Sequence, residues 1–337
     1  MNTAAKNYDG VNKYIRITDI DEASSTYTDK DIVSPDGVLT DNYLVNNRDI
    51  LLARTGASTG KSYLYKKSDG KLYFAGFLIR ANVTTHDPYF VFSQLHTHRY
   101  WRWVSIMSAR SGQPGINSQE YSSFPIYITS IEEESKIAKL LSLLDERITT
   151  QNKIIDKLLS LIKGIRNKLF ENDKDWRKAK IREFLCIGNG KDYKHLDIGD
   201  IPVYGTGGKM LSVNDFLYDG DSVCIGRKGT IDTPLFLTGK FWTVDTLFYT
   251  YGFKDVLPKF CYYLFKQINW QLYNEGTGVP SLSKSTIENI KVRIPSIVQQ
   301  YKICYILDSY EDKIKNEGLI LDLYCSQKQY LLRQMFV

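Results

Sequence analysis

The segment most suggestive of chemistry is Thr55-Gly-Ala-Ser-Thr-Gly-Lys-Ser62, which nearly matches the loop that holds nucleotide phosphates. That loop starts with a small residue and leads into a helix whose N-terminus faces the phosphates. Here Thr55 takes the first position, and the residues from Ser62 onward alternate as in a strand. The segment therefore indicates a glycine-rich loop at the end of a strand. Its backbone N–H groups, together with Arg54 and Lys61, are predicted to contact DNA phosphates.

Other basic and polar positions extend this prediction. The segment His96-Thr-His-Arg-Tyr-Trp-Arg-Trp103 mixes cations with aromatic residues, and its arginines can reach phosphates or guanine edges. An amphipathic helix with the aromatic rings in a protein core explains the same pattern, and both interpretations remain open. Two polar loops, Gly112–Ser118 and Gly276–Lys284, precede a final strand in each half of the chain. The predicted DNA-contacting residues are Arg54, Thr55, Lys61, Arg99, Arg102, Asn117, Ser118, Arg227, Lys228, Thr230, Ser283 and Lys284.

Patterns for catalysis are incomplete. Asp87-Pro-Tyr-Phe90 lacks the second proline of the amino-methyltransferase motif, and no glycine-rich cofactor loop follows a predicted strand. Pro35-Asp36 with Asp69-Gly-Lys71 fits a nuclease pattern loosely, but Asp69-Gly70 is also typical of a hairpin turn. His96 and His98 have no cysteine or carboxylate at zinc-like spacing, so no metal site is predicted. An enzyme with a dispersed active site stays open as an alternative.

The elements that position these residues are organised by an internal repeat. The block from Pro114 to Ile148 recurs without a gap 166 residues later, from Pro280 to Ile314. A repeat of this length is too long for a solenoid and indicates one large unit used twice. The chain is therefore predicted to have pseudo-twofold symmetry.

Each copy of the repeat predicts a long helix that starts with a capping box. Ser130 precedes Glu133 by three positions, and Ser296 precedes Gln299 in the same way. Beyond the caps, apolar residues recur at steps of four and three, as in the contact seam of a coiled coil. The predicted seam consists of Ile137, Leu141, Leu144, Ile148, Ile155, Leu158 and Ile162 in the first copy, and Ile303, Leu307, Tyr310, Ile314, Leu321 and Tyr324 in the second.

Polar residues interrupt both seams. Gln151 and Glu317 occupy equivalent positions, and a polar residue in a seam can fix the register of two helices. Lys328 breaks the second seam further along. Because the two helices belong to one chain with pseudo-twofold symmetry, we expect them to pack antiparallel against each other.

Composition agrees with a globular protein of about two domains. The net charge of +6 resides in the segments outside the predicted helices, which fits contact with a polyanion. No apolar run approaches the roughly 20 residues of a membrane span, and no signal peptide is evident at the N-terminus. The 5 cysteines form no Cys-x-x-Cys motif and are expected to be reduced thiols in the cytoplasm.

These features together resemble the specificity subunits of type I restriction–modification systems. The first similarity is the loop Gly112–Ser118 leading through Phe124-Pro-Ile-Tyr-Ile128 to the capped helix that begins at Glu132. The second is its other copy, Gly278-Val-Pro-Ser-Leu-Ser283, followed by Val292-Arg-Ile-Pro295. The third is the opening Trp-x-x-x-x-Ile-x-Glu-Phe at Trp176–Phe184. No counterpart of this opening precedes Tyr14, so the first module is expected to lack its opening segment.

The resemblance implies an α+β fold in which two mixed α/β target-recognition domains are separated by two long antiparallel helices forming a coiled coil. It implies a first recognition domain at 1–129, a spacer helix at 130–171, a second recognition domain at 172–295 and a second spacer helix at 296–337. Each domain would bind half of a bipartite site in double-stranded DNA. The helices would dock two modification subunits, which are joined by restriction subunits. This chain would carry no cofactor, because S-adenosylmethionine, ATP and Mg²⁺ would belong to the partner subunits.

Three functions remain as hypotheses. The leading one is a non-catalytic DNA-sequence recognition subunit, and its main rival is a stand-alone nuclease or methyltransferase. A third is a scaffold that binds partner helices without DNA. A steep dependence of DNA affinity on salt would separate the first from the third, because phosphate contacts release counterions.

Overall fold

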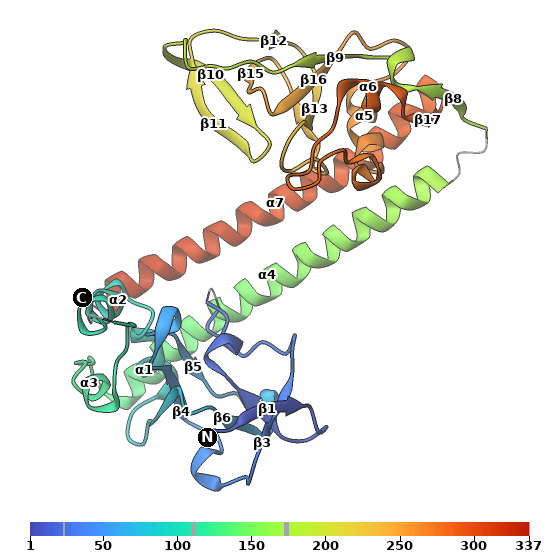
Figure 1. The fold of residues 1–337 in the computed structure, drawn as a ribbon. Coiled ribbons are helices and arrows are strands. Elements are labelled where there is room, and N and C mark those ends of the chain that lie inside the picture. Colours follow the sequence, from blue (N-terminus) through green and yellow to red (C-terminus); the bar gives the residue numbers. More distant parts are fainter. Residues whose placement is uncertain (23, 110–111, 172–174, 337) are drawn as a thin grey trace. The chain divides into compact units, whose positions relative to one another are not determined.

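The computed structural model describes residues 1–22, 24–109, 112–171 and 175–336 (Figure 1). By compactness this part of the chain forms two units, one with residues 1–155 and 317–337 and one with residues 156–316. Each unit contains one globular module and part of each long helix. The predicted domain limits at 172 and 337 lie outside the described residues, and the four predicted segments remain a prediction.

Module 1, the globular part of the first unit, holds three small sheets. Strand order is β1-β3 in one sheet, β2-β6 in the second and β5-β4-β7 in the third. The strands are Ala4–Asn7 (β1), Lys13–Ile15 (β2), Val33–Asp36 (β3), Asp49–Ala53 (β4), Ser62–Leu64 (β5), Leu72–Phe74 (β6) and Leu78–Asn82 (β7). The helices are Pro88–Gln94 (α1), His98–Met107 (α2) and Ser118–Ser122 (α3), with one-turn 3₁₀ segments at Ile17–Asp19, Asp41–Tyr43, Gly56–Ser58 (η3) and Lys67–Asp69.

Module 2, the globular part of the second unit, has larger sheets with the orders β11-β10-β15-β12, β14-β13-β16-β9 and β17-β8. Its strands are Arg177–Lys180 (β8), Cys186–Asn189 (β9), Ile198–Gly205 (β10), Gly208–Val213 (β11), Tyr218–Asp219 (β12), Ser222–Gly226 (β13), Leu235–Leu237 (β14), Lys240–Thr243 (β15), Leu247–Tyr251 (β16) and Lys291–Ile294 (β17). Its helices are Pro258–Phe265 (α5) and Lys284–Asn289 (α6), with 3₁₀ segments at Ile181–Glu183 (η5) and Trp270–Tyr273.

The modules share a central three-stranded pattern. In module 1, β4 pairs with β5 and β7; in module 2, β13 pairs with β14 and β16, and all four pairings are antiparallel. β4 and β13 are buried along their full length, as expected for central strands that are covered on both faces. The sequences of Asp49–Gly56 and Asp221–Gly229 are similar, and each segment consists of this central strand and the turn that follows it.

The two long helices are Ile131–Glu171 (α4) and Ile297–Met335 (α7). Both begin directly after the predicted caps. The Ser130 hydroxyl accepts from the Glu133 N–H at 3.3 Å, and in the second copy Ser296 and Gln299 bond reciprocally. No helix in the described part of the chain is both long and apolar enough to span a bilayer.

Seam residues of both helices are buried or half-buried, and none is exposed. In the first unit, Gln151 donates to Glu317 at 2.5 Å, so the two equivalent polar residues meet across the helix pair. Leu141 packs in one cluster with Leu332, and Leu332 lies near the other end of α7, so the helices run antiparallel. Lys328 does not leave a gap in the seam, because its ammonium pairs with Asp145 at 2.6 Å. The predicted fold class is confirmed.

The apolar pattern of the sequence predicts one helix over Tyr89–Ser108 and single strands over Phe74–Ala81 and Phe241–Tyr251, and the structure divides each of them in two. The helix expected over Tyr89–Ser108 is two helices, because the Thr97 side chain caps α2 by accepting from the Tyr100 N–H. The strands expected over Phe74–Ala81 and Phe241–Tyr251 are each two strands separated by a turn. In both turns the chain moves from one sheet to another, which a continuous apolar pattern does not reveal.

Candidate nucleic-acid interface

The predicted DNA-contacting residues of module 1 gather on a turn that follows β4. The Gly56 N–H donates to the Pro114 carbonyl and the Ile116 N–H donates to the Arg54 carbonyl, each at 2.9 Å. Gly56 has a φ of +69°, a conformation that favours glycine. These bonds fasten the turn to the loop 112–118, so the structure joins two segments that the sequence analysis named separately.

Two buried tyrosines hold the base of this turn. The Tyr121 hydroxyl donates to the Ala53 carbonyl at 2.6 Å and accepts from the Gly60 N–H at 3.1 Å. The Tyr100 hydroxyl donates to the Gly60 carbonyl at 2.8 Å. Burial raises the pKa of Tyr121 to about 12 and that of Tyr100 well above its ordinary value, so both remain donors at neutral pH. The turn is therefore a rigid platform, and it continues into a strand, β5, as the sequence predicted.

Module 2 builds the same turn after β13. The Gly229 N–H donates to the Pro280 carbonyl and the Leu282 N–H donates to the Arg227 carbonyl, each at 2.9 Å. Gly229 also has a positive φ, +86°. Arg54 and Arg227 thus take equivalent positions, and Lys228 stands where module 1 has Thr55. The two turns therefore have the same backbone geometry.

The partner loop of module 2 is held by its own side chains. The Asn274 side chain accepts from the N–H groups of Gly276 and Ser281, both at 2.9 Å. Glu275 accepts from the Ser283 hydroxyl at 2.9 Å and also from Thr286. These two hydroxyl bonds lower the pKa of Glu275, which keeps it ionised. The loop therefore presents a fixed shape beside Arg227.

Electrostatics favour an anion at both turns. Arg54, Arg227, Lys228 and Thr230 are exposed. Within the described ranges, no carboxylate forms an ion pair with Arg54, Arg227 or Lys228. Exposed cations beside fixed backbone loops are the arrangement that proteins use to contact nucleic-acid phosphates.

Other predicted residues have intramolecular partners. Lys61 pairs with Glu22 at 3.2 Å, and Lys284 lies 3.7 Å from Glu288. Arg99 donates to the Pro125 carbonyl at 2.6 Å, and its guanidinium lies 4.3 Å from the centre of the Tyr127 ring. Of the two interpretations of residues 96–103, Arg99 therefore fits the structural one.

Of the remaining predicted DNA-contacting residues, two have structural roles and two are exposed. Asn117 and Ser283 cap α3 and α6 by accepting backbone N–H groups. Ser118 and Arg102 are exposed on helices, with no structural bond assigned to their side chains in the described part.

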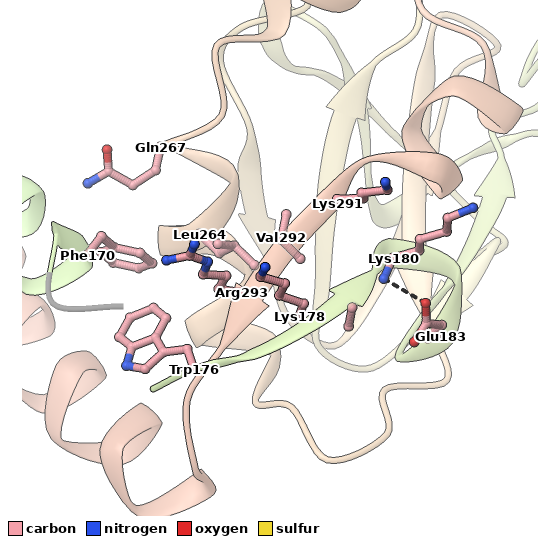
Figure 2. A pocket seen from close by; sticks show the side chains of 11 residues that line it. Phe170, Trp176, Lys178, Lys180, Glu183, Leu264, Gln267, Lys291, Val292 and Arg293 are labelled. Atoms are coloured by element: carbon pink, nitrogen blue, oxygen red, sulfur yellow. Dashed lines mark hydrogen bonds between the residues drawn. The ribbon is translucent and has the colours of Figure 1, made fainter. Parts of the chain in front are cut away.

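Sequence reasoning missed a second basic surface in module 2. Lys178 and Lys180 on β8 stand directly opposite Arg293 and Lys291 on β17, so cations face each other across the ribbon (Figure 2). They line a cavity of about 730 Å³ in which Glu183 is the acidic lining residue. Like charges placed directly opposite each other on two strands are destabilising. The alternation Arg-Lys-Ala-Lys at 177–180 was the available signal.

The residues considered for a nuclease site or a zinc site make structural contacts. Asp69 accepts from the Tyr63 hydroxyl at 2.5 Å, and Asp36 lies in β3 opposite Ala4. His96 is held between the Phe92 carbonyl and the Ser25 hydroxyl, and burial lowers its pKa to about 4. In the part of the chain that the structure describes, no cluster of three His, Cys, Asp or Glu side chains is placed to hold a metal ion.

The family model of the type I restriction modification DNA specificity domain matches residues 1–160 and 173–322, which together are most of the chain. The chain belongs to this family. Among specificity subunits, that of the type I restriction enzyme MjaVIII from Methanocaldococcus jannaschii is 23% identical over 330 residues, covering 81% of this chain and 74% of that protein. The putative specificity subunit S.HindORF215P from Haemophilus influenzae is 29% identical over 152 residues, which is 39% of either chain.

Solved structures agree on the fold of this specificity subunit. The S subunit of a type I restriction–modification system from M. genitalium has a TM-score of 0.68 at 18% identity, covering 98% of this chain and 89% of that one. A chain from a structural study of complex assembly in the type I R-M system has a TM-score of 0.60 at 13% identity, covering 99% and 94%. The predicted family is therefore confirmed, and with it the role of a non-catalytic DNA specificity subunit.

Proposed function

We propose that each module of this specificity subunit contacts one half of a bipartite DNA target through its arginine turn. In module 1 the contact would be made by Arg54 and Thr55, and in module 2 by Arg227, Lys228 and Thr230. Arginine can neutralise a phosphate or bond bidentately to guanine in the major groove. The observation that carries the proposal is the same turn built twice, by equivalent backbone bonds to Pro114 and Pro280, with different side chains beside a shared arginine.

The long helices would set the distance between the two half-sites. α4 is one unbroken helix of 41 residues, which corresponds to about 60 Å at about 1.5 Å per residue. Because DNA presents the same groove once per helical turn, a fixed spacing also fixes the phase of the second contact. Inserting one heptad into both helices should change the preferred spacing, and an unchanged spacing would contradict this part of the proposal.

The other subunits would bring the chemistry. We propose that two modification subunits dock on the helices and carry S-adenosylmethionine, and that restriction subunits bring ATP and Mg²⁺ chemistry to the complex. The complex would act in the cytoplasm, where DNA is accessible. The five free cysteines support a reducing compartment.

The test is methylation mapping in cells that carry the complete operon. Arg54→Ala should abolish or relax recognition in one half-site, and Arg227→Ala should do so in the other. Lys67→Ala and Lys254→Ala serve as matched controls, because both lysines are exposed cations outside the turns. An arginine–guanine contact is worth about 1–3 kcal/mol, so each variant should lose roughly ten- to hundredfold in methylation of its target.

Two results would contradict the proposal. One is full methylation of the original target by both arginine variants. The other is cleavage or methylation of DNA by the purified chain alone with Mg²⁺ and S-adenosylmethionine, which would favour the enzymatic alternative.

A further inference from the structure

Arg166 of α4 is a half-buried cation without an acceptor. Its Nε atom is buried, and among the described residues its side chain forms no hydrogen bond and no ion pair. Burial lowers the pKa of the Arg166 guanidinium, and the attraction of Tyr262 and Glu311 offsets this lowering only in part. An arginine side chain nevertheless stays protonated at neutral pH. A buried polar group without a partner is rare in proteins, and it indicates that an ion, a water or a ligand belongs beside it.

The first unit has an apolar residue at the equivalent position. The repeat places Leu332 there, and this side chain is 1% exposed and packs in one cluster with Leu141. The cation of α7 in the first unit is Lys328, one helical turn earlier, and it is paired with Asp145 at 2.6 Å. The unpaired cation is therefore a feature of the second unit and not of the repeat.

The carboxylates of this region are paired with lysines of module 2. Glu311 stands at the repeat position of Asp145, but it pairs with Lys259 at 3.3 Å and with Lys266 at 3.0 Å. Lys259 also pairs with Asp308 at 3.2 Å. The module thus neutralises the carboxylate that could have balanced the charge of the long helix, and the guanidinium is left without a counterion.

Arg166 lines a cleft of about 460 Å³ between α4, α5 and α7, entirely within the second unit. Sites for small molecules have volumes of roughly 300–1,000 Å³ and mostly apolar walls. Leu307 is completely buried, whereas Leu159 is 49% exposed, so the cleft extends from the core of the unit to its surface. The apolar wall residues are Leu159, Ile162, Tyr263, Leu307 and Ile314.

Positive charge dominates the polar part of the lining. Glu311 is the acidic lining residue, and the cations are Lys163, Arg166, Lys266 and Lys315. Lys163 and Lys315 are exposed, and neither forms an ion pair with a described residue. Since Lys266 is paired with Glu311, three of the four cations have no carboxylate partner. The cleft is therefore complementary to an anion.

The lining also defines what kind of anion fits. A guanidinium presents parallel N–H donors that bond a carboxylate in a bidentate manner. The apolar walls offer no donors to replace the water around a bare inorganic anion, which makes its transfer into the cleft costly. They do offer contact to an apolar group. The ligand that matches both features has one carboxylate and an apolar body.

We propose that this cleft binds a small organic acid whose carboxylate pairs with Arg166 and whose apolar body lies against Leu159, Ile162 and Ile314. The acid would give the guanidinium its acceptor and would cover apolar side chains of two long helices. It would thereby strengthen the attachment of α5 to α4 and α7 in the second unit. The inference does not depend on DNA recognition, because neither Arg227 nor Lys228 lines the cleft.

The experiment is calorimetric titration of the full chain with 3-phenylpropionate, an acid with a phenyl ring on a short arm. Its amide, 3-phenylpropanamide, is the matched control, because it has the same shape without the charge. We expect saturable binding of the acid and binding of the amide that is weaker by roughly ten- to hundredfold, the usual contribution of hydrogen bonds to a charged group. Inorganic phosphate at the same concentration should not displace the acid.

Three results of this titration would contradict the proposal. If acid and amide bound equally, the cleft would be an apolar groove in which the charge of Arg166 has no role. If phosphate displaced the acid, the cleft would be a site for inorganic anions. If the acid did not bind at all, the cleft would not be a ligand site.

A variant tests the residue itself. Arg166→Leu introduces the residue type of the equivalent position in the first unit, and it should abolish binding of the acid. It should also raise the melting temperature, because it removes an unpaired charge from a half-buried position. Lys157→Leu removes an exposed cation of α4 outside the cleft and should change neither quantity. Retained binding in Arg166→Leu, or a melting temperature below that of wild type, would show that Arg166 has a different role.

A last titration distinguishes a free acid from an acidic side chain of a partner. The acid should bind the assembled restriction–modification complex with the same affinity as the full chain alone. Binding that is lost on assembly would overturn the proposal of a free ligand in favour of a partner carboxylate in the cleft.

Discussion

An acidic residue stands at the same repeat position in both units, Asp145 in the first and Glu311 in the second, yet each is paired differently. Asp145 pairs with Lys328 of α7 at 2.6 Å and accepts from the Tyr89 hydroxyl. Glu311 pairs with two lysines of module 2, at positions 259 and 266, at 3.3 and 3.0 Å. The cation comes from the opposite long helix in one unit and from the module in the other.

A second equivalent pair differs in charge. Glu134 is fully buried and accepts from the Asp87 N–H at 2.9 Å, with His86 at 2.8 Å. Gln300, also fully buried, accepts from the Leu257 N–H at 2.8 Å and donates to the carbonyls of Pro295 and Asp255. Both side chains attach the start of a module helix to the start of a long helix. The repeat therefore places residues at equivalent positions in the two units. Different polar contacts at these positions attach each module to its part of the long helices.

The largest expected effects come from the apolar positions that the two units share. Leu141 and Leu307 are equivalent, and both are completely buried. Replacing either with Ala should lower the free energy of unfolding by about 2–5 kcal/mol. Leu307→Ala should cost more, because Leu307 belongs to the larger core cluster. Denaturant unfolding followed by hydrogen exchange in each unit would measure this. Equal exchange in both units for both variants would contradict the division into two separately stabilised units.

Exchanging the two attachment residues should have unequal costs. Gln300→Glu places a carboxylate beside two carbonyl oxygens and should destabilise the second unit by about 2–3 kcal/mol. Glu134→Gln keeps the acceptor for the Asp87 N–H and should cost about 1 kcal/mol. Thermal unfolding of the two single variants would test this, with Glu133→Gln on the exposed helix surface as the control. A larger cost for Glu134→Gln would show that the charge of Glu134 dominates its role.

A smaller effect is expected at the lysine in the second seam. Lys328→Ala removes a partly buried ion pair and should lower stability by about 1 kcal/mol. Lys136→Ala removes a neighbouring exposed pair with Glu133, 3.7 Å apart, and should change stability by less than about 0.5 kcal/mol. Chemical denaturation at low and high salt would compare them. If Lys136→Ala lowered stability as much as Lys328→Ala, burial of an ion pair in the seam would not increase its contribution to stability.

The smallest expected effect is on the dependence of stability on acidic pH. Burial alone raises the pKa of Glu134, but hydrogen bonds from Asp87, His86 and Thr129 outweigh it and leave the pKa below its ordinary value. The corresponding stability is present above the ordinary pKa of about 4.5 and is lost as the pH falls through the lowered value. Glu134→Gln should remove this part of the acid sensitivity. Unfolding curves between pH 7 and pH 3.5 would show it, and identical slopes for wild type and variant would contradict it. Wild type is the proper reference, because Glu311 also has a lowered pKa.

The sequence alone was sufficient to predict the pair of long helices. The caps at Ser130 and Ser296, the seams and the meeting of Gln151 with Glu317 all follow from spacing within one helix and from the repeat. The two arginine turns also share a local sequence signal, because each follows a short apolar strand and contains a glycine. Helix caps and apolar seams depend on residues only a few positions apart, so they can be recognised directly in the sequence.

Contacts between distant residues decided the rest. Arg99 donates to the Pro125 carbonyl and Tyr121 to the Ala53 carbonyl, and these partners lie 26 and 68 residues apart in the sequence. Strand pairing and side-chain partners depend on which distant segments come together in the folded chain. The local periodicity of the sequence contains no information about these tertiary contacts.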